Sequence, residues 1–110
     1  QLNSSKPRRD YVNIDDAVNA LYLAICSNLN GYNVFNIASN KSYSVKEVTV
    51  LFERHLQDKS IRFIFNSNKI RKNEVLETRG SNDLAKAKIG WEPTISFDDG
   101  LKEILDKENL

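Results

Sequence analysis

The stretch RRDYVNIDDAVNAL, Arg8 to Leu21, contains the transition on which the fold depends. Apolar residues within Tyr11–Ile14 predict a short strand, and the amphipathic pattern that follows predicts a helix. Asp15 or Asp16 is expected to cap that helix, because a carboxylate accepts hydrogen bonds from the unpaired N–H groups of a helix start. A strand-to-helix junction of this kind often holds an anionic ligand, and equally often holds none.

Four helices are expected along the chain. The first runs from the acidic pair to about Ser27, and the second begins at Ser44. Ser44-x-x-Glu47 has the form of a capping box, in which each side chain bonds the other residue's backbone N–H. A short third helix is expected to end at Gly90, and the last to begin at Ser96. The apolar face of the first helix consists of Val18, Leu21, Tyr22 and Ile25.

Two further short apolar runs, Tyr32–Ser39 and Ile61–Phe65, are predicted to be strands. Residues 66–80 are polar and charged without a clear period, which predicts a long loop of the kind that often binds a ligand. The order β-α-β-α-β-loop-α-α predicts a mixed α/β fold. Residues 1–7 are polar and contain a proline, so a tail or linker is expected there, followed by one segment over residues 8–110.

The charge balance of the chain argues against several classes of partner. Lys and Arg number 16 against 15 Asp and Glu, so no overall basic field attracts nucleic acid or an anionic membrane. No apolar run approaches the roughly 20 residues of a membrane span. The single cysteine, Cys26, excludes an internal disulfide and predicts a cytoplasmic protein in which this thiol is buried. Because the chain begins with Gln1 and contains no methionine, it is expected to be a fragment.

Most catalytic constellations are absent from the sequence. One histidine and one cysteine cannot supply the usual ligands of a zinc site, and no tyrosine is followed four residues later by a lysine. The four glycines are isolated and form no phosphate-binding loop. His55 falls on the apolar stripe of its helix, so a packed histidine is expected there in preference to a catalytic base. No catalytic, cofactor-binding or metal-binding residue is therefore predicted within the chain.

Two places could bind an anionic ligand: the pair Arg8-Arg9 before the first strand, and RKNE, Arg71 to Glu74, in the long loop. An arginine presents a planar set of donors that matches phosphate oxygens, and a carboxylate accepts from a vicinal diol. Two arginines and one glutamate would thus suit a nucleoside diphosphate. The alternative is that these side chains are ordinary solvated surface.

Several motifs resemble those of extended short-chain dehydrogenase/reductases that act on nucleotide sugars. RDYVNIDDAVNALYLAI is similar to the family's R-D-F/Y-V/I-x-V/I-x-D-x-A/V stretch, and VFNIAS followed by YSVKEV to its Y-N-I-G-S-G strand and next helix start. RKNEV falls where the family has R-P-G-D/E. SNDLAKAKIGWEPTISFDDGLKEIL resembles the closing run with its Gly-Trp-x-Pro and Asp-Gly-Leu elements. The resemblance covers nearly the whole chain from Arg8 onward. Lys72-Asn73 in place of Pro-Gly is one departure, and it affects the turn that presents Glu74.

The resemblance implies NAD- or NADP-dependent epimerases, dehydratases and reductases of nucleotide sugars. This chain would be the C-terminal substrate-binding portion, and the Rossmann domain that binds the dinucleotide would be absent. By the same resemblance, Arg9 would contact the diphosphate, Arg71 the phosphates or ribose, and Glu74 the ribose hydroxyls. The nucleotide-diphosphate sugar would be the ligand, and the catalytic tyrosine and lysine would lie outside the chain.

The leading hypothesis is the nucleotide-sugar-binding portion of an NAD-dependent 4-epimerase similar to those of UDP-glucose, inactive on its own. A portion of a 4,6-dehydratase or a reductase is the alternative within the family. A non-catalytic regulatory or oligomerisation module, or a general interaction domain, are alternatives from other classes. Without a Rossmann sheet, the apolar face of the first helix and the edge of the second strand would be exposed, so self-association or packing against the missing domain is expected.

Overall fold

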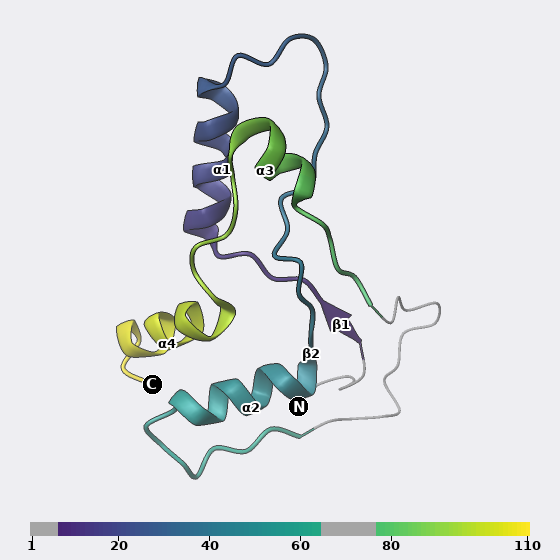
Figure 1. Ribbon diagram of the computed structural model, residues 1–110. Coiled ribbons are helices and arrows are strands. Elements are labelled where there is room, and N and C mark those ends of the chain that lie inside the picture. Colours follow the sequence, from purple (N-terminus) through teal and green to yellow (C-terminus); the bar gives the residue numbers. More distant parts are fainter. Residues whose placement is uncertain (1–6, 65–76) are drawn as a thin grey trace.

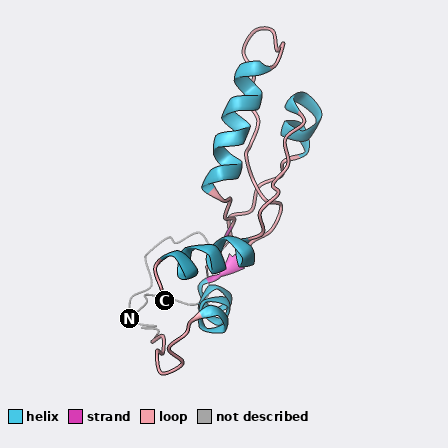
Figure 2. Ribbon diagram, turned by 90° about the vertical axis from the view of Figure 1, so that its left-hand side faces the viewer, coloured by secondary structure: helices cyan, strands magenta, loops and turns pink. Residues whose placement is uncertain are grey.

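The computed structural model describes residues 7–64 and 77–110 (Figure 1). Its elements are β1 (Arg8–Arg9), α1 (Ile14–Cys26), β2 (Tyr43–Ser44), α2 (Val45–His55), α3 (Asp83–Ile89) and α4 (Phe97–Lys107). The radius of gyration is 16.9 Å, whereas a compact chain of this length would have about 13 Å. The shape is elongated because two helix pairs, α1 with α3 and α2 with α4, lie at opposite ends (Figure 2).

The first pair, which we call the α1–α3 unit, packs around Trp91. The buried residues of this core are Ala20, Ala85 and Trp91. Trp91 is fully buried, and its indole Nε1 donates a hydrogen bond of 2.8 Å to the carbonyl oxygen of Asp16 in α1. As predicted, α3 ends at Gly90, whose φ of +67° is a left-handed conformation that glycine adopts without steric cost. Trp91 thus joins α1, α3 and the segment that follows α3.

The second pair, the α2–α4 unit, has a separate core of Leu56, Leu101 and Leu105. Its helices begin where the sequence predicts. The capping box is confirmed, since Ser44 Oγ accepts from the Glu47 N–H and the Glu47 carboxylate accepts from the Ser44 N–H, both at 3.1 Å. Ser96 caps α4 by accepting from the Asp99 N–H. His55 is packed as expected, and its Nε2 lies 2.7 Å from Asp98 Oδ1 of α4.

The strands differ from those predicted. The one ladder among the described residues is antiparallel and joins Arg8 to Ser44 and Arg9 to Tyr43. The predicted strands over residues 11–14 and 32–39 are wrong: residues 11–13 and 32–39 have no regular structure, and residue 14 begins α1. Residues 61–64 form no strand either, and residue 65 lies outside the described residues. A strand requires a hydrogen-bonding neighbour, so apolar alternation alone does not create one.

The acidic pair does not cap α1, which corrects the predicted role of Asp15 and Asp16. Asn13 is the N-cap, because its Oδ1 accepts from the Asp15 N–H at 2.9 Å. Asp16 is buried, and its carboxylate accepts from Thr94 N, Thr94 Oγ1 and Ile95 N at 3.1, 2.9 and 3.0 Å. Asp16 therefore fastens α1 to the segment that leads into α4.

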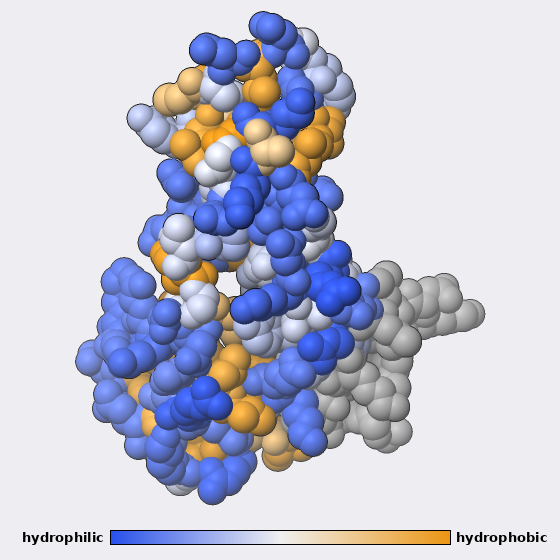
Figure 3. Space-filling model, viewed as in Figure 1, coloured by the Kyte–Doolittle hydropathy of each residue, from blue (hydrophilic) through white to orange (hydrophobic). Residues whose placement is uncertain are grey.

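One face of α1 is open. Its apolar side chains are largely exposed, with Leu21 at 66% and Ile25 at 82%, and Figure 3 shows apolar side chains gathered at this end of the molecule. The sequence predicted such exposure for a chain without a Rossmann sheet. Cys26 is also exposed, so its predicted burial is wrong. Within residues 7–64 and 77–110, no helix has the length and apolar character needed to cross a membrane.

Candidate functional site

The short ladder of β1 and β2 separates the two adjacent arginines. Residues that are directly opposite in an antiparallel ladder project toward the same face, and neighbours along a strand project toward opposite faces. Arg8, opposite Ser44, therefore shares the face from which α2 begins, while Arg9 shares the other face with Tyr43. The sequence treats Arg8-Arg9 as one candidate site, but the structure gives each arginine its own surroundings.

Arg8 is held by several protein groups. Its Nη1 donates to Glu47 Oε1 at 2.9 Å, its Nε to Ser42 Oγ at 3.1 Å and its Nη2 to the Ser42 carbonyl at 2.9 Å. The hydrogen bond with Glu47 raises the pKa of Arg8 above its ordinary value. The same bond, aided by the Ser44 N–H, lowers the pKa of Glu47. Arg8 therefore joins β1 to the start of α2.

Arg9, the predicted phosphate contact, is half-buried on β1, and its Nη1 donates to the Arg8 carbonyl at 2.8 Å. The residue that follows, Asp10, accepts hydrogen bonds from three donors in distant parts of the chain. Asp10 Oδ1 lies 2.9 Å from Ser39 N and 2.7 Å from Ser39 Oγ, and Oδ2 lies 3.1 Å from Gly80 N. The backbone on the C-terminal side of Arg9 is thus fixed to two other segments.

An aromatic cluster lies near Arg9. The Phe97 ring is 5.0 Å from the ring of Tyr43, which is opposite Arg9 in the ladder, and 4.9 Å from the ring of Tyr11. Phe97 is the first residue of α4, so this cluster connects the ladder to the α2–α4 unit. Aromatic faces beside an arginine can stack on a planar ligand or support the guanidinium.

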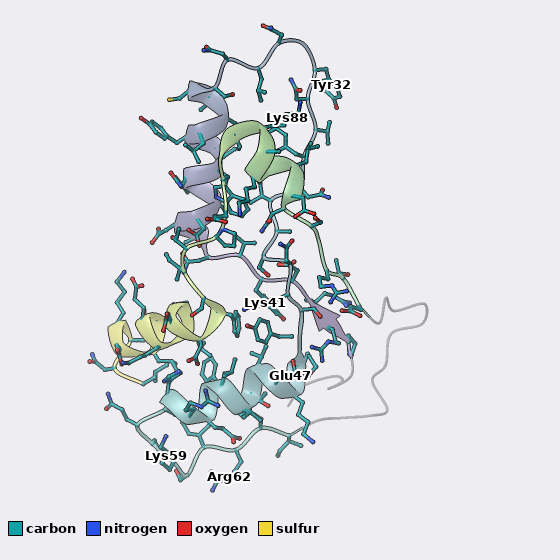
Figure 4. The ribbon with its side chains drawn as sticks, in the orientation of Figure 1. Tyr32, Lys41, Glu47, Lys59, Arg62 and Lys88 are labelled. Carbon is teal, nitrogen blue, oxygen red and sulfur yellow. The ribbon has the colours of Figure 1, made fainter. Side chains whose placement is uncertain are left out.

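On the Arg8 side, the surface is hollowed over about 860 Å³. Lys41 and Glu47 are two of the side chains at this hollow (Figure 4). Among the described residues, its charged lining consists of Arg8, Lys41, Lys46, Arg79, Glu47 and Glu77. Because Arg8 is already bonded to Glu47, part of the positive charge at this hollow is neutralised by a carboxylate of the protein. The hollow is wide enough for a ligand, but its charge selects no particular one.

The other two predicted site residues, Arg71 and Glu74, lie outside the described residues. The description resumes at Glu77, which forms a parallel bridge with Arg8, and the Thr78 N–H donates to the Arg8 carbonyl at 2.9 Å. The chain that has passed through Arg71 and Glu74 therefore returns beside β1. Sequence reasoning missed Asp10, because its partners are 29 and 70 residues away and no local pattern indicates them.

The glycines of the chain serve close packing and positive-φ positions. A Cβ on Gly80 would lie 2.6 Å from the Ala38 Cβ, and one on Gly100 would lie 2.8 Å from Asn13 Nδ2. These two glycines thus permit close packing of protein on protein, while Gly31 and Gly90 adopt positive φ. The part of the chain that the structure describes also contains no group of three or more residues able to hold a metal ion.

A family profile and individual relatives identify the same class of proteins for this chain. Residues 1–104 match the sequence profile of the GDP-mannose 4,6 dehydratase family. A dTDP-4-dehydro-6-deoxyglucose reductase of Escherichia coli is 29% identical, with 94% of this chain and 32% of that protein covered. A UDP-glucuronate 4-epimerase of Thermodesulfobacterium geofontis is 31% identical, with 93% of this chain and 31% of that protein covered.

Among solved structures, the UDP-glucose 4-epimerase of Thermotoga maritima with UDP-glucose matches 100% of this chain and 35% of its own. Its sequence is 28% identical, and the TM-score is 0.81. The chain thus spans about a third of the length of the relatives it matches. The ladder and the helices of the described residues correspond to the C-terminal part of these structures. The chain therefore belongs to the GDP-mannose 4,6 dehydratase family, and it matches the C-terminal portion of NAD-dependent nucleotide-sugar epimerases and dehydratases of the extended short-chain dehydrogenase/reductase class.

Proposed function

We propose that this chain is the nucleotide-sugar-binding portion of an NAD-dependent sugar-nucleotide 4-epimerase. The observation that carries this proposal is the match, over the whole chain, to an epimerase solved with UDP-glucose. Relatives of this chain also include a reductase, and the family profile is that of a dehydratase. A portion of a 4,6-dehydratase or a reductase is therefore the alternative reaction, and the nucleotide-sugar ligand is common to all three.

In this proposal, the residues of the chain bind and orient the ligand. Arg9 donates to the diphosphate, because a guanidinium matches phosphate oxygens with paired N–H groups. Arg71 supplies a second cation for the phosphates or ribose, and Glu74 accepts from the ribose hydroxyls. Binding energy from the nucleotide then helps to hold the sugar in position for reaction.

The redox chemistry belongs to a nicotinamide dinucleotide. Solved structures that share this fold contain NAD or NADPH, and that cofactor supplies and accepts hydride when bound. We infer that the remainder of the enzyme binds this cofactor and that this chain does not. We therefore assign the chain a binding role, and we expect it to be inactive without the remainder of the enzyme.

Nucleotide binding tests this proposal. The folded chain is titrated with UDP, dTDP and GDP by calorimetry, and Arg9→Ala is compared with Arg62→Ala. Arg62 is a suitable control, since its exposed guanidinium lies on the loop after α2, away from β1 (Figure 4). We expect Arg9→Ala to weaken binding of the preferred nucleotide about tenfold or more, as loss of a charge-assisted hydrogen bond predicts. Equal affinities for the two variants would contradict the proposal.

The open face of α1 favours a second candidate, a module that binds another protein surface without catalysis. The occupant of that face would be a Rossmann domain or a second copy of this chain. Titration with nucleotides separates the candidates, because a purely associative module would bind none of them.

The exposed thiol of Cys26 suits a reducing compartment. We therefore also propose that the protein is cytoplasmic.

A further inference from the structure

Two carboxylates, Asp10 and Asp16, connect distant parts of the chain in the same way. Each accepts hydrogen bonds from two backbone N–H groups and one hydroxyl of later segments. Asp10 takes them from Ser39 and Gly80, and Asp16 from Thr94 and Ile95. The two differ in what they adjoin, because Asp10 directly follows Arg9 and Asp16 lies within α1.

The surroundings of Asp10 show how closely three segments converge beside Arg9. A Cβ on Gly80 would be only 2.6 Å from the Ala38 Cβ, so the absence of a side chain lets the Gly80 backbone approach residues 38–39. Both oxygens of Asp10 then accept donors from these segments. A buried or half-buried carboxylate with several N–H donors holds backbone firmly, because each bond to a charged group exceeds a neutral one in strength.

The backbone of residues 8–10 is consequently fastened on both sides. The ladder joins Arg9 to Tyr43, the Thr78 N–H bonds the Arg8 carbonyl, and that same carbonyl accepts from Arg9 Nη1. The direction of the Arg9 side chain therefore depends on where this short length of backbone is held. Moving residue 10 would move both the Cα of Arg9 and the carbonyl that its guanidinium bonds.

From this geometry we infer that Asp10 is a positioning residue, which holds the guanidinium of Arg9 in the orientation needed to bind a nucleoside diphosphate. The inference rests on the proposed function, in which Arg9 contacts the diphosphate. In this role Asp10 acts through protein groups and not by direct contact with the ligand. Its carboxylate acts through the Ser39 and Gly80 donors, which keep the Arg9 backbone in place.

The test compares Asp10→Asn with Asp16→Asn as a matched control. Both changes replace one charged oxygen with an amide NH2, which cannot accept, and both disturb bonds to a distant segment. UDP affinity and thermal midpoint are measured for each. We expect both variants to lose stability, Asp10→Asn to weaken UDP binding about tenfold, and Asp16→Asn to stay within about twofold of the original chain.

A double variant shows whether Asp10 acts through Arg9. In an Arg9→Ala background, Asp10→Asn should have no further effect on UDP affinity, because the group that it positions is gone. In the otherwise unchanged chain, Asp10→Asn should also shift the Arg9 Nε–Hε signal in an NMR spectrum. A structural role alone would give additive losses of affinity and the same signal for Arg9.

The outcomes distinguish a failure of the positioning role of Asp10 from a failure of the proposed function. If Arg9→Ala leaves UDP, dTDP and GDP affinities unchanged, the proposed function fails. If Arg9→Ala weakens binding but Asp10→Asn behaves like Asp16→Asn, only the positioning role fails. Should Asp10→Asn not fold, Ser39→Ala removes the hydroxyl donor of the 2.7 Å bond to Asp10, together with its bonds to the Lys41 backbone, and leaves both backbone N–H donors to Asp10 in place. It should give a smaller loss of affinity in the same direction. An unchanged affinity in that variant would overturn the positioning role.

Discussion

Helix α1 of the α1–α3 unit and helix α4 of the α2–α4 unit are both amphipathic, with 13 and 11 residues, but α4 buries more of its apolar face than α1 does. In α4, Leu105 is 1% exposed and packs with Leu56 of the segment after α2. In α1, Ala20 faces Trp91, while Leu21 and Ile25 remain largely exposed. The difference shows that an amphipathic helix buries only the face that has a packing partner, and no described residue covers the face of α1 that carries Leu21 and Ile25.

The two units are joined by hydrogen bonds and by the contact of Tyr11 with Phe97. Their cores share no buried residue, and Asp10 and Asp16 provide hydrogen bonds between segments at the junction. Cooperative unfolding depends on buried apolar contacts that cross such a junction. We therefore expect the two units to respond separately to changes in their cores, and the predictions below test that separation.

Trp91→Ala should have the largest effect. Removing a fully buried tryptophan should cost about 3–5 kcal/mol and should disrupt the packing of α1 on α3. Urea unfolding followed by circular dichroism measures the loss, and amide exchange shows where it falls. Trp91→Phe is the milder control, since it keeps a ring but leaves the Asp16 carbonyl without its indole donor. Reduced protection in α4 as large as that in α1 would argue against separate units.

Leu105→Ala is the matching change in the other core. It should cost about 2–5 kcal/mol, because it opens a cavity between α4 and α2. Trp91 is the only tryptophan of the chain, so its fluorescence reports on the α1–α3 unit alone. In the variant, the circular dichroism midpoint in urea should fall further than the fluorescence midpoint. Coincident midpoints would show that the two cores unfold together.

A smaller effect on stability is expected on the open face of α1. Leu21→Glu with Ile25→Glu should change the free energy of unfolding by about 0.5 kcal/mol or less, because both side chains are already exposed. The unchanged chain should self-associate in sedimentation and bind an apolar dye, and the double variant should do both less. An unchanged chain that sediments as a compact monomer and binds no dye would contradict this reading of the face.

The smallest effect concerns pH. The pKa of Glu47 is lowered from its ordinary value of 4.5, first by the hydrogen bond from Arg8 and then by the Ser44 N–H. A carboxyl whose pKa is lower in the folded state stabilises the fold above its unfolded pKa, and this stability is lost as pH falls through the folded value. Glu47→Gln should therefore flatten the fall in stability below about pH 4.5.

Asp58 provides the control for that measurement. Its pKa is also lowered, by hydrogen bonds from Ser60, but it lies outside the helix caps and the ladder. Asp58→Asn should remove only its own part of the acid dependence and leave that of Glu47. The same acid profile in Glu47→Gln and in the unchanged chain would show that the bond between Arg8 and Glu47 has no measurable effect.

Local interactions were predictable from the sequence. Ser44 and Glu47 are three residues apart, and Gly90 and Ser96 mark helix ends through their own backbone or side chain. Asp16 was not predictable, since a carboxylate near a helix start is usually a cap, whereas its real partners come 78 and 79 residues later. The apolar run of residues 32–39 predicted a strand, but no described segment supplies the ladder that it would need.

In the candidate site too, contacts between residues far apart in the sequence could not be predicted. Motif resemblance selected Arg9, and the ladder then separates it from Arg8, whose donors bond Ser42 and Glu47. Arg71 and Glu74 stay predictions. The part played by Asp10 became visible only when segments 29 and 70 residues apart from it were seen together.

The bond between Trp91 and Asp16 has a consequence for biosynthesis. The two residues are 75 positions apart, so a ribosome completes α1 long before it makes the indole that packs on it. At about 5–20 residues per second, the interval is roughly 4–15 s. During that time the side of α1 that will face Trp91 lacks the indole that later covers it. We therefore expect this side of α1 to bind chaperones while the chain is being made.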